Sequence, residues 1–177
     1  MNNYISKKLL LIVLFVFIHT ISNTEIRRNI FLDLGYSILT NKKNVPFEPA
    51  NRLAWVFGYG YTVSERTDIF LVAGTEHAQK DMVVIYGVEF FHFYRKQHLV
   101  QPFFGYGLIF SQLWNKELKG REAGHYTKLK FGVALKGRKG NKWLISCSYV
   151  ITNYPSFDRE AINLNLLNFS IGRYWGL

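Results

Sequence analysis

Residue types that carry out chemistry are sparse in this sequence. It contains one cysteine and no Cys-x-x-Cys, His-Glu-x-x-His or phosphate-binding glycine loop. Its histidines are not spaced as metal ligands are, so the sequence predicts no metal site and no cofactor. The five histidines are His19, His77, His92, His98 and His125.

The strongest candidates for chemistry lie in the last third of the chain. Thr152 and Asn153 end a segment in which apolar and small residues alternate. If that segment pairs with the preceding one about the connection 137–141, Thr152 lies opposite Tyr126 and beside His125. A hydroxyl activated by a nearby imidazole is a nucleophile, so His125 and Thr152 are candidate catalytic residues.

The next hairpin extends this cluster, because its pairing places Thr152 roughly opposite Asn163. Asn153, Asn163 and Tyr126 are therefore candidate ligand-binding residues. Two simpler interpretations remain open. In the first, His125, which follows a loop glycine, is simply a solvated loop residue. In the second, Thr152-Asn153 is simply the end of a strand that enters a turn. The alternation also places Thr152 on the inner face of its strand.

The elements that must position these residues are strands, because period-two patterning runs through the chain after the first 26 residues. In the clearest segment, Leu129 and Phe131 alternate with Lys128, Lys130 and Gly132. No long amphipathic helix is predicted there. The expected strands are 27–39, 52–63, 69–77, 82–94, 99–114, 126–136, 142–152 and 163–175.

The two faces of these strands predict their surroundings. One face is large and aromatic and the other is small or polar, and a narrow eight-stranded barrel has room inside only for the second kind. The fold class predicted is all-β, an eight-stranded antiparallel up-and-down transmembrane β-barrel. A soluble barrel with a ligand cavity is the alternative, but it places its largest apolar residues on the glycine-bearing face. The segments 52–63, 126–136 and 142–152 show the reverse.

The connections give a second test of the barrel. Transmembrane barrels alternate short periplasmic turns with longer outer loops. With a periplasmic N-terminus, the inner connections are all short and three of the four outer ones are long. The inner connections are 64–68, 95–98 and 137–141, and the outer ones are 40–51, 78–81, 115–125 and 153–162.

The N-terminal segment 1–22 has the layout of a secretory signal. Lys7 and Lys8 precede an apolar run over 9–18, and small or polar residues follow. A retained membrane helix is the alternative, although the run is only half of the roughly 20 residues that a spanning helix needs. The mature domain is expected to be 23–177 and to lie in the cell outer membrane.

The basic charge balance fits either scattered Lys and Arg on loops or contact with anionic lipid. Without Lys7 and Lys8 the formal net charge falls from +10 to +8, and an exported protein meets anionic lipid headgroups rather than nucleic acid. Basic residues of the outer connections, such as Lys42, Lys43 and Arg121, either grip lipopolysaccharide phosphates or are simply solvated. Charges on the inner face are expected to pair in the lumen, because an unpaired buried charge is costly. These are Lys128, Lys130, Arg52, Asp33, Glu76 and Glu89.

The last third of the chain resembles the lipid A deacylases, which are PagL-like acyloxyacyl hydrolases. The resemblance lies in the order of four segments, QPFFGYGL, KLKFGVALKG, KWLISCSYVITN and NLNLLNFSIGRYW. The resemblance covers about 101–175. It implies an outer-membrane barrel that removes an ester-linked acyl chain from lipid A, with a His-x-Ser-Asn signature at the end of the seventh strand. Alignment on Asn153 places Thr152 at the serine and Val150 at the histidine, and Asn165 falls near the third catalytic position.

This departure from the signature shapes the predicted function. A valine accepts no proton, so the resemblance implies a chain that is inactive or uses another base. The first hypothesis is a non-enzymatic member that contacts lipopolysaccharide. The second is an active lipid A esterase with His125 and Thr152 in the catalytic roles. The third is a purely structural or adhesive barrel.

Overall fold

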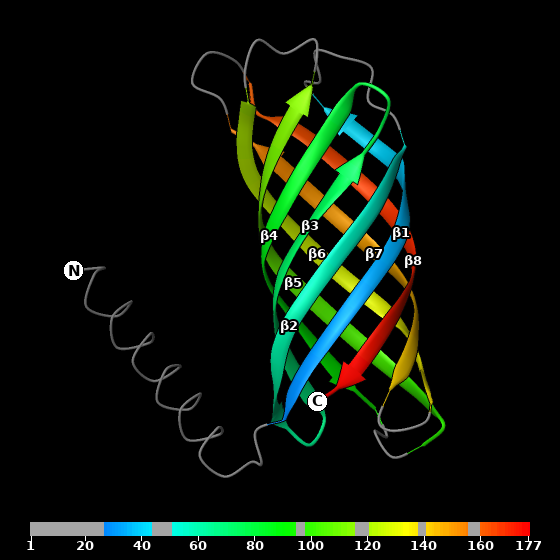
Figure 1. The fold of residues 1–177 in the computed structure, drawn as a ribbon. Coiled ribbons are helices and arrows are strands. Elements are labelled where there is room, and N and C mark those ends of the chain that lie inside the picture. The colour runs from blue at the N-terminus through cyan, green and yellow to red at the C-terminus, as the bar shows by residue number, and fades with distance from the viewer. Residues whose placement is uncertain (1–26, 44–50, 95–97, 116–120, 138–140, 156–159) are drawn as a thin grey trace, which may run out of the picture.

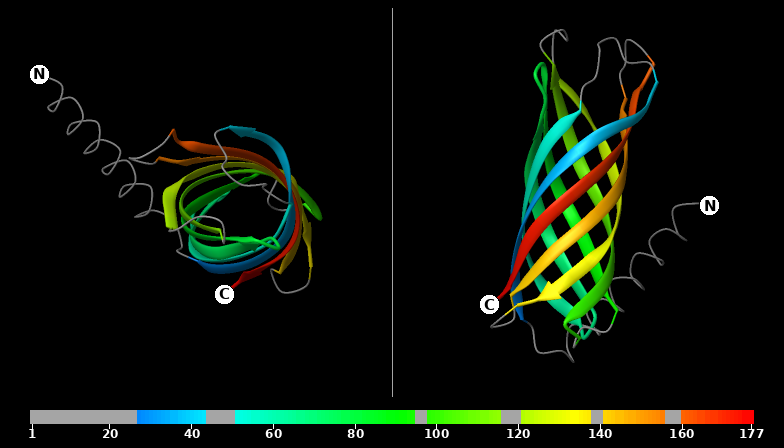
Figure 2. Two further views of the ribbon diagram at one scale, coloured as in Figure 1. Left: turned by 90° about the horizontal axis from the view of Figure 1, so that it is seen from above. Right: turned by 90° about the vertical axis from the view of Figure 1, so that its right-hand side faces the viewer.

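The alternating segments form eight antiparallel strands in a computed structural model that describes residues 27–43, 51–94, 98–115, 121–137, 141–155 and 160–177. Each strand pairs with its chain neighbour and β8 pairs back onto β1, so the sheet closes into a barrel and the predicted fold class is confirmed (Figure 1). Figure 2 shows the closed ring from above. The strands are β1 (Arg28–Lys43), β2 (Arg52–Ser64), β3 (Thr67–His77), β4 (Asp81–Phe93), β5 (Val100–Asn115), β6 (Arg121–Lys136), β7 (Lys142–Tyr154) and β8 (Ile162–Gly176).

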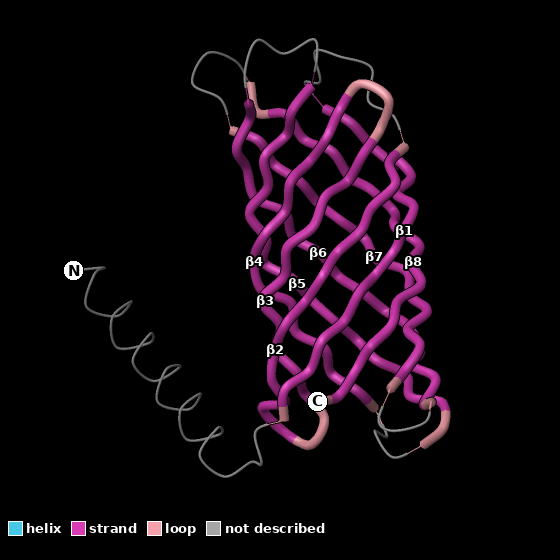
Figure 3. The backbone as a smooth tube through the Cα atoms, in the orientation of Figure 1, coloured by secondary structure: helices cyan, strands magenta, loops and turns pink. Residues whose placement is uncertain are grey.

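Several strands extend further than the sequence predicts. β1 continues to Lys43, β6 begins at Arg121 and β7 continues to Tyr154, so the predicted loops at these positions are wrong in part (Figure 3). Apolar alternation fades at these ends, but backbone pairing needs no apolar side chain and continues into the polar residues. The predicted signal 1–22 lies outside the described residues. Among the residues that the structure describes, no helix is long and apolar enough to cross a membrane.

The strands present their apolar side chains outward. On β5 the side chains of Leu108 and Phe110 are 61% and 62% exposed, whereas Ile109 between them is 3% exposed. The large outward-facing residues include Trp55, Phe57, Phe131 and Trp143. An exposed apolar surface of this extent suits a hydrocarbon solvent, and the predicted orientation of the strand faces is confirmed.

Aromatic side chains fill the lumen near the terminal end of the barrel, which is the end where β1 begins and β8 ends. The rings of Phe31 and Phe70 meet edge to face with centroids 4.8 Å apart, and Phe91 packs on both. Gly58 makes room for this cluster, because a Cβ atom there would lie 2.1 Å from the Phe31 ring. The opposite end, which carries the connections β1–β2, β3–β4, β5–β6 and β7–β8, is called the distal end below.

The strands are strongly tilted, as the views in Figures 1 and 2 show. Paired residues traced once around the barrel from Leu32 return to β1 at Lys43, eleven residues further along. One of those residues is the extra one of a register shift between Leu39 and Asn41. A closed barrel requires such a stagger, and it places the last residues of β1 beside the first residues of β8.

Candidate functional site

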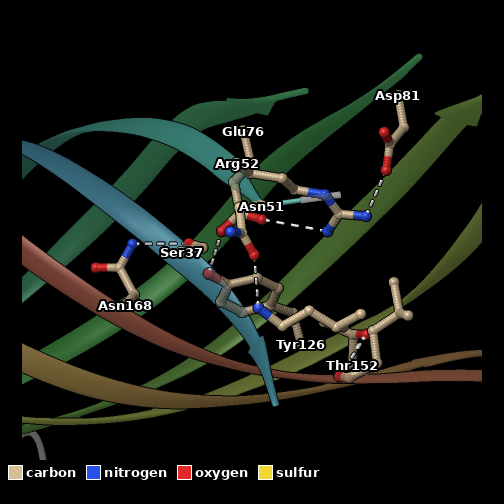
Figure 4. Close-up of polar contacts among 10 residues, drawn as sticks. Ser37, Asn51, Arg52, Glu76, Asp81, Tyr126, Thr152 and Asn168 are labelled. Carbon is tan, nitrogen blue, oxygen red and sulfur yellow. Dashed lines mark hydrogen bonds and ion pairs between the residues drawn. The ribbon is translucent and has the colours of Figure 1, made fainter. Parts of the chain in front are cut away.

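The six residues predicted to form a site occupy neighbouring strands but two faces. Thr152 pairs with Tyr126, as predicted, whereas its partner on β8 is Leu164 and not Asn163. The Thr152 side chain is fully buried, and its hydroxyl donates to the backbone carbonyl of Leu164 at 2.9 Å (Figure 4). The hydroxyl of Thr152 is therefore engaged inside the wall of the barrel.

His125 lies on the other face. It precedes Tyr126 on β6, and alternation turns its exposed side chain outward while Tyr126 points into the lumen and is 3% exposed. The Tyr126 hydroxyl donates to Glu76 Oε1 at 2.8 Å. The structure therefore does not bring the His125 imidazole to the Thr152 hydroxyl. Nor is His125 in a loop, because β6 begins four residues earlier.

The three asparagines share the outward face with His125. Asn153 pairs with His125 on one side and with Asn163 on the other, and its amide donates to Asn163 Oδ1 at 2.7 Å. Asn163 in turn pairs with Lys43 on β1. Residues directly opposite in antiparallel strands share a face. His125, Asn153, Asn163 and Lys43 therefore form one outward row across four strands, which we call the distal row.

A second outward pair lies one step below the distal row. Asn165 pairs with Asn41, and the backbone carbonyl of Asn165 accepts a hydrogen bond from the Thr40 hydroxyl at 2.9 Å. Below this pair the outward residues of β1 and β8 are apolar, for example Ile38 and its partner Leu167. The polar side chains thus begin where the apolar band ends on this side of the barrel.

A β-bulge decides which residues of β1 face outward. Ile38 is an outward residue, so strict alternation would turn Asn41 and Lys43 inward. The register shift leaves Thr40 unpaired between Leu39 and Asn41, and Asn41 and Lys43 then pair with outward-facing asparagines of β8. Bulges re-aim side chains in this way, often at the rims of barrels.

The distal half of the lumen holds an ionic network. Arg52 donates through Nη2 to Asp81 Oδ2 at 2.8 Å and lies 3.5 Å through Nη1 from Glu76 Oε2 (Figure 4). Both acidic side chains and the guanidinium are almost fully buried. Tyr126 reaches Glu76 from β6, so this cluster ties four strands together.

Two lysines of β6 complete the network nearer the middle of the barrel. Lys128 Nζ donates to Glu89 Oε1 at 2.9 Å, and Lys130 Nζ donates to Asp33 Oδ2, which also accepts from Ser170. The pairing predicted for the six inner charges is confirmed. Buried ions persist when each is matched and hydrogen-bonded.

Sequence reasoning missed one member of the ionic network and one outward-facing polar pair. Asp81 was expected in a connection, yet it begins β4 and binds Arg52. Thr75 and His77 form an outward-facing pair at the distal end of β3, with Thr75 Oγ1 and His77 Nε2 2.7 Å apart. The i, i+2 spacing of these two residues on one strand is the signal that could have found them. Within the described ranges, no group of three potential metal ligands from His, Cys, Asp and Glu is assembled.

The comparisons with known proteins identify the fold. No protein-family model and no curated protein sequence matches the chain. Among solved structures, it resembles Neisserial surface protein A (NspA), with 11% identity and a TM-score of 0.66 over 86% of this chain and 97% of that one. The N-terminal β-barrel domain of Pseudomonas aeruginosa OprF gives 10% identity and a TM-score of 0.58, over 85% and 100% of the two chains.

A third structure, the outer membrane protein AlkL in lipid bilayers, gives 10% identity and a TM-score of 0.51 over 85% of this chain and 90% of that one. All three are outer-membrane β-barrels, which supports the predicted location in the cell outer membrane. At these identities the likeness concerns the fold, and none of the three is a lipid A deacylase by its description.

Proposed function

We propose that this chain is an outer-membrane barrel that contacts lipopolysaccharide at its distal end without hydrolysing it. The observation that carries the proposal is the distal row, which is polar and faces outward directly above an apolar band. Because the strands are tilted, the row climbs toward the distal rim from His125 to Lys43. In a transmembrane barrel the distal edge of the apolar band meets the headgroups of the outer leaflet, if the terminal end is periplasmic. Amide and cationic side chains suit the hydroxyls and phosphates of a glycolipid headgroup.

The geometry at Thr152 argues against the hydrolase implied by the deacylase resemblance. The acyl chains of a membrane lipid lie outside the barrel, whereas the side chains of Thr152 and Val150 are fully buried. The Thr152 hydroxyl already donates to Leu164. A nucleophile needs both a base and access to the ester carbonyl, and Thr152 has neither in this arrangement.

An acyl ester hydrolase remains a second candidate function because of a different pair. Thr75 and His77 face outward near the distal end of β3 and are within hydrogen-bonding distance of each other. This is the contact that a nucleophile and its base require. A hydrolase that uses this pair predicts a change in lipid A that depends on Thr75, and the hydrolase implied by the deacylase resemblance predicts one that depends on Thr152.

The first experiment compares the lipid A of cells with and without the protein by mass spectrometry. The non-hydrolytic proposal predicts identical acylation in cells that carry the wild type, Thr75→Val or Thr152→Val. An acyl chain lost with the wild type and retained with Thr75→Val would establish the hydrolase in place of our proposal.

The second experiment tests the contact itself. Refolded wild-type barrel in zwitterionic detergent is titrated with lipopolysaccharide, and the complexes are counted by native mass spectrometry. We expect saturable binding. Absence of any complex would leave a purely structural or adhesive barrel as the better description.

A further inference from the structure

The bulge at Thr40 gives the distal row a cation, Lys43, at its β1 end. Lys43 ends the row on β1 and His125 ends it on β6, with the amides of Asn153 and Asn163 between them. The register shift at Thr40 turns Lys43 outward. Strict alternation would turn it toward the mouth of the lumen.

The neighbouring lysine provides a natural contrast. Lys42 pairs with Leu164, whose side chain is fully buried on the lumen face. Lys42 therefore belongs to the inward face at the mouth, and Lys43 belongs to the outward face beside Asn163. Two adjacent residues with the same charge are thus assigned to the two sides of the barrel wall.

Among the described residues, the other side of the barrel carries outward polar side chains, namely Thr75, His77 and Gln112, but their partners in register are apolar and they form no row. At the distal ends of β2 and β4 the outward residues Leu53 and Met82 are apolar, and both pair with His77. Polar side chains in register are concentrated on β6, β7, β8 and β1. A feature confined to one side indicates a specific contact rather than a general belt of solvated residues.

We infer that the distal row and the pair Asn41–Asn165 bind the phosphorylated sugar headgroup of an outer-leaflet glycolipid, with Lys43 on a phosphate and the amides on sugar hydroxyls. The inference rests on the proposed function and adds the site, the chemical group recognised and its orientation. An ammonium is a point donor that suits a phosphate oxygen. An asparagine amide offers both a donor and an acceptor, as a sugar hydroxyl requires.

The test uses adjacent substitutions that change the charge equally. Refolded Lys43→Glu and Lys42→Glu barrels are titrated with lipid A carrying its phosphates and with dephosphorylated lipid A, and complexes are counted by native mass spectrometry. Lys43→Glu should weaken binding of the phosphorylated lipid by about tenfold, the value of one charge-assisted hydrogen bond. Lys42→Glu should weaken it by less than about twofold, because Lys42 lies on the inward face of the wall and its exposed charge is screened by solvent.

Lys43→Gln is the milder companion, and it should lose the preference for the phosphorylated lipid while retaining binding. Folding of each variant is checked by heat-modifiable migration on gels. Millimolar inorganic phosphate should not displace the lipid. If it does, the site holds a free anion and the inference is overturned.

The remaining outcomes separate this inference from the proposed function. Equal losses in Lys43→Glu and Lys42→Glu, or no loss in either, would overturn the site while leaving lipopolysaccharide contact intact. Failure of the wild-type barrel to bind any lipopolysaccharide would overturn both.

Discussion

The lumen face and the lipid face of β6 carry opposite chemistries in a single run of residues. Lys130 is 1% exposed and pairs with Asp33 across the lumen, whereas the adjacent Phe131 is 59% exposed. In a water-soluble protein these two exposures would be exchanged. The difference shows that burial is not the same as apolarity here, because the solvent outside the barrel is hydrocarbon and the interior is the polar phase.

The two faces also differ in how their side chains are held. Each inner charge has a partner far away in the sequence: Lys128 and Lys130 have one acidic partner each, and Arg52 has two. The glycines of β5 leave room for them, since Gly107 lies between Glu89 and Lys128. The outer side chains need no specific partner, because lipid chains adapt to any apolar shape. The inner face should therefore be sensitive to loss of a partner, and the outer face to gain of a charge.

The largest effect is expected from Lys130→Met. It leaves the buried Asp33 carboxylate without its cation, and breaking a buried pair on one side costs about 3–5 kcal/mol. We expect a loss of this size in the free energy of unfolding, measured by denaturant titration of the refolded barrel in lipid. The matched control is Lys136→Met at the exposed end of the same strand, which should change stability by less than about 0.5 kcal/mol.

A double variant sharpens this test. Lys130→Met combined with Asp33→Asn removes both charges and should recover much of the lost stability, because the uncompensated ion is the source of the cost. A double variant as unstable as the single one would show that the packing of the lysine stem, and not its charge, stabilises the lumen.

Alternation along the chain was sufficient to predict the faces, but not the partners. The face of Lys130 could be read from its neighbours, since strand residues alternate. Its partner Asp33 lies 97 positions earlier in the sequence. Partner choice across the lumen depends on the stagger of the whole barrel, which no local pattern contains.

The candidate site was predictable to a similar extent. The pairing of Thr152 with Tyr126 followed from the short connection 137–141, because a hairpin fixes its own register. The outward direction of Lys43 did not follow, because it depends on a bulge at Thr40 that no glycine or proline marks. The pair His125 and Thr152 fails because Thr152 shares the inner face with its partner Tyr126, and the adjacent His125 faces the other way.

A smaller effect is expected from placing a charge on the lipid face with Leu129→Lys. Leu129 faces outward in the middle of β6, directly between two lysines that are stable on the inner face. A lysine facing the centre of a bilayer costs about 2–4 kcal/mol. The same measurement of unfolding should show this loss, and His125→Lys, on the same face but at the headgroup level, should cost about 0–1 kcal/mol.

Equal costs at Leu129 and His125 would contradict the assignment of the middle of β6 to hydrocarbon and of the distal row to headgroups. Equal tolerance of lysine at both positions would contradict the membrane itself as the solvent of this face.

The smallest effect is expected from Thr152→Val, which removes one hydroxyl group from the inner face and is compared with the same change on the outer face. The buried Thr152 hydroxyl donates to the Leu164 carbonyl, and loss of such a bond costs about 1 kcal/mol. Valine keeps the shape of the side chain, so the unfolding free energy isolates the hydrogen bond.

Thr127→Val is the control, because Thr127 faces outward between Leu108 and Ile151, where a methyl group in place of a hydroxyl suits lipid. We expect Thr127→Val to be neutral or stabilising. Destabilisation by Thr127→Val that equals that of Thr152→Val would mean that the outer face is hydrated at Thr127, and Thr127 would then belong to the headgroup region and not to the apolar band.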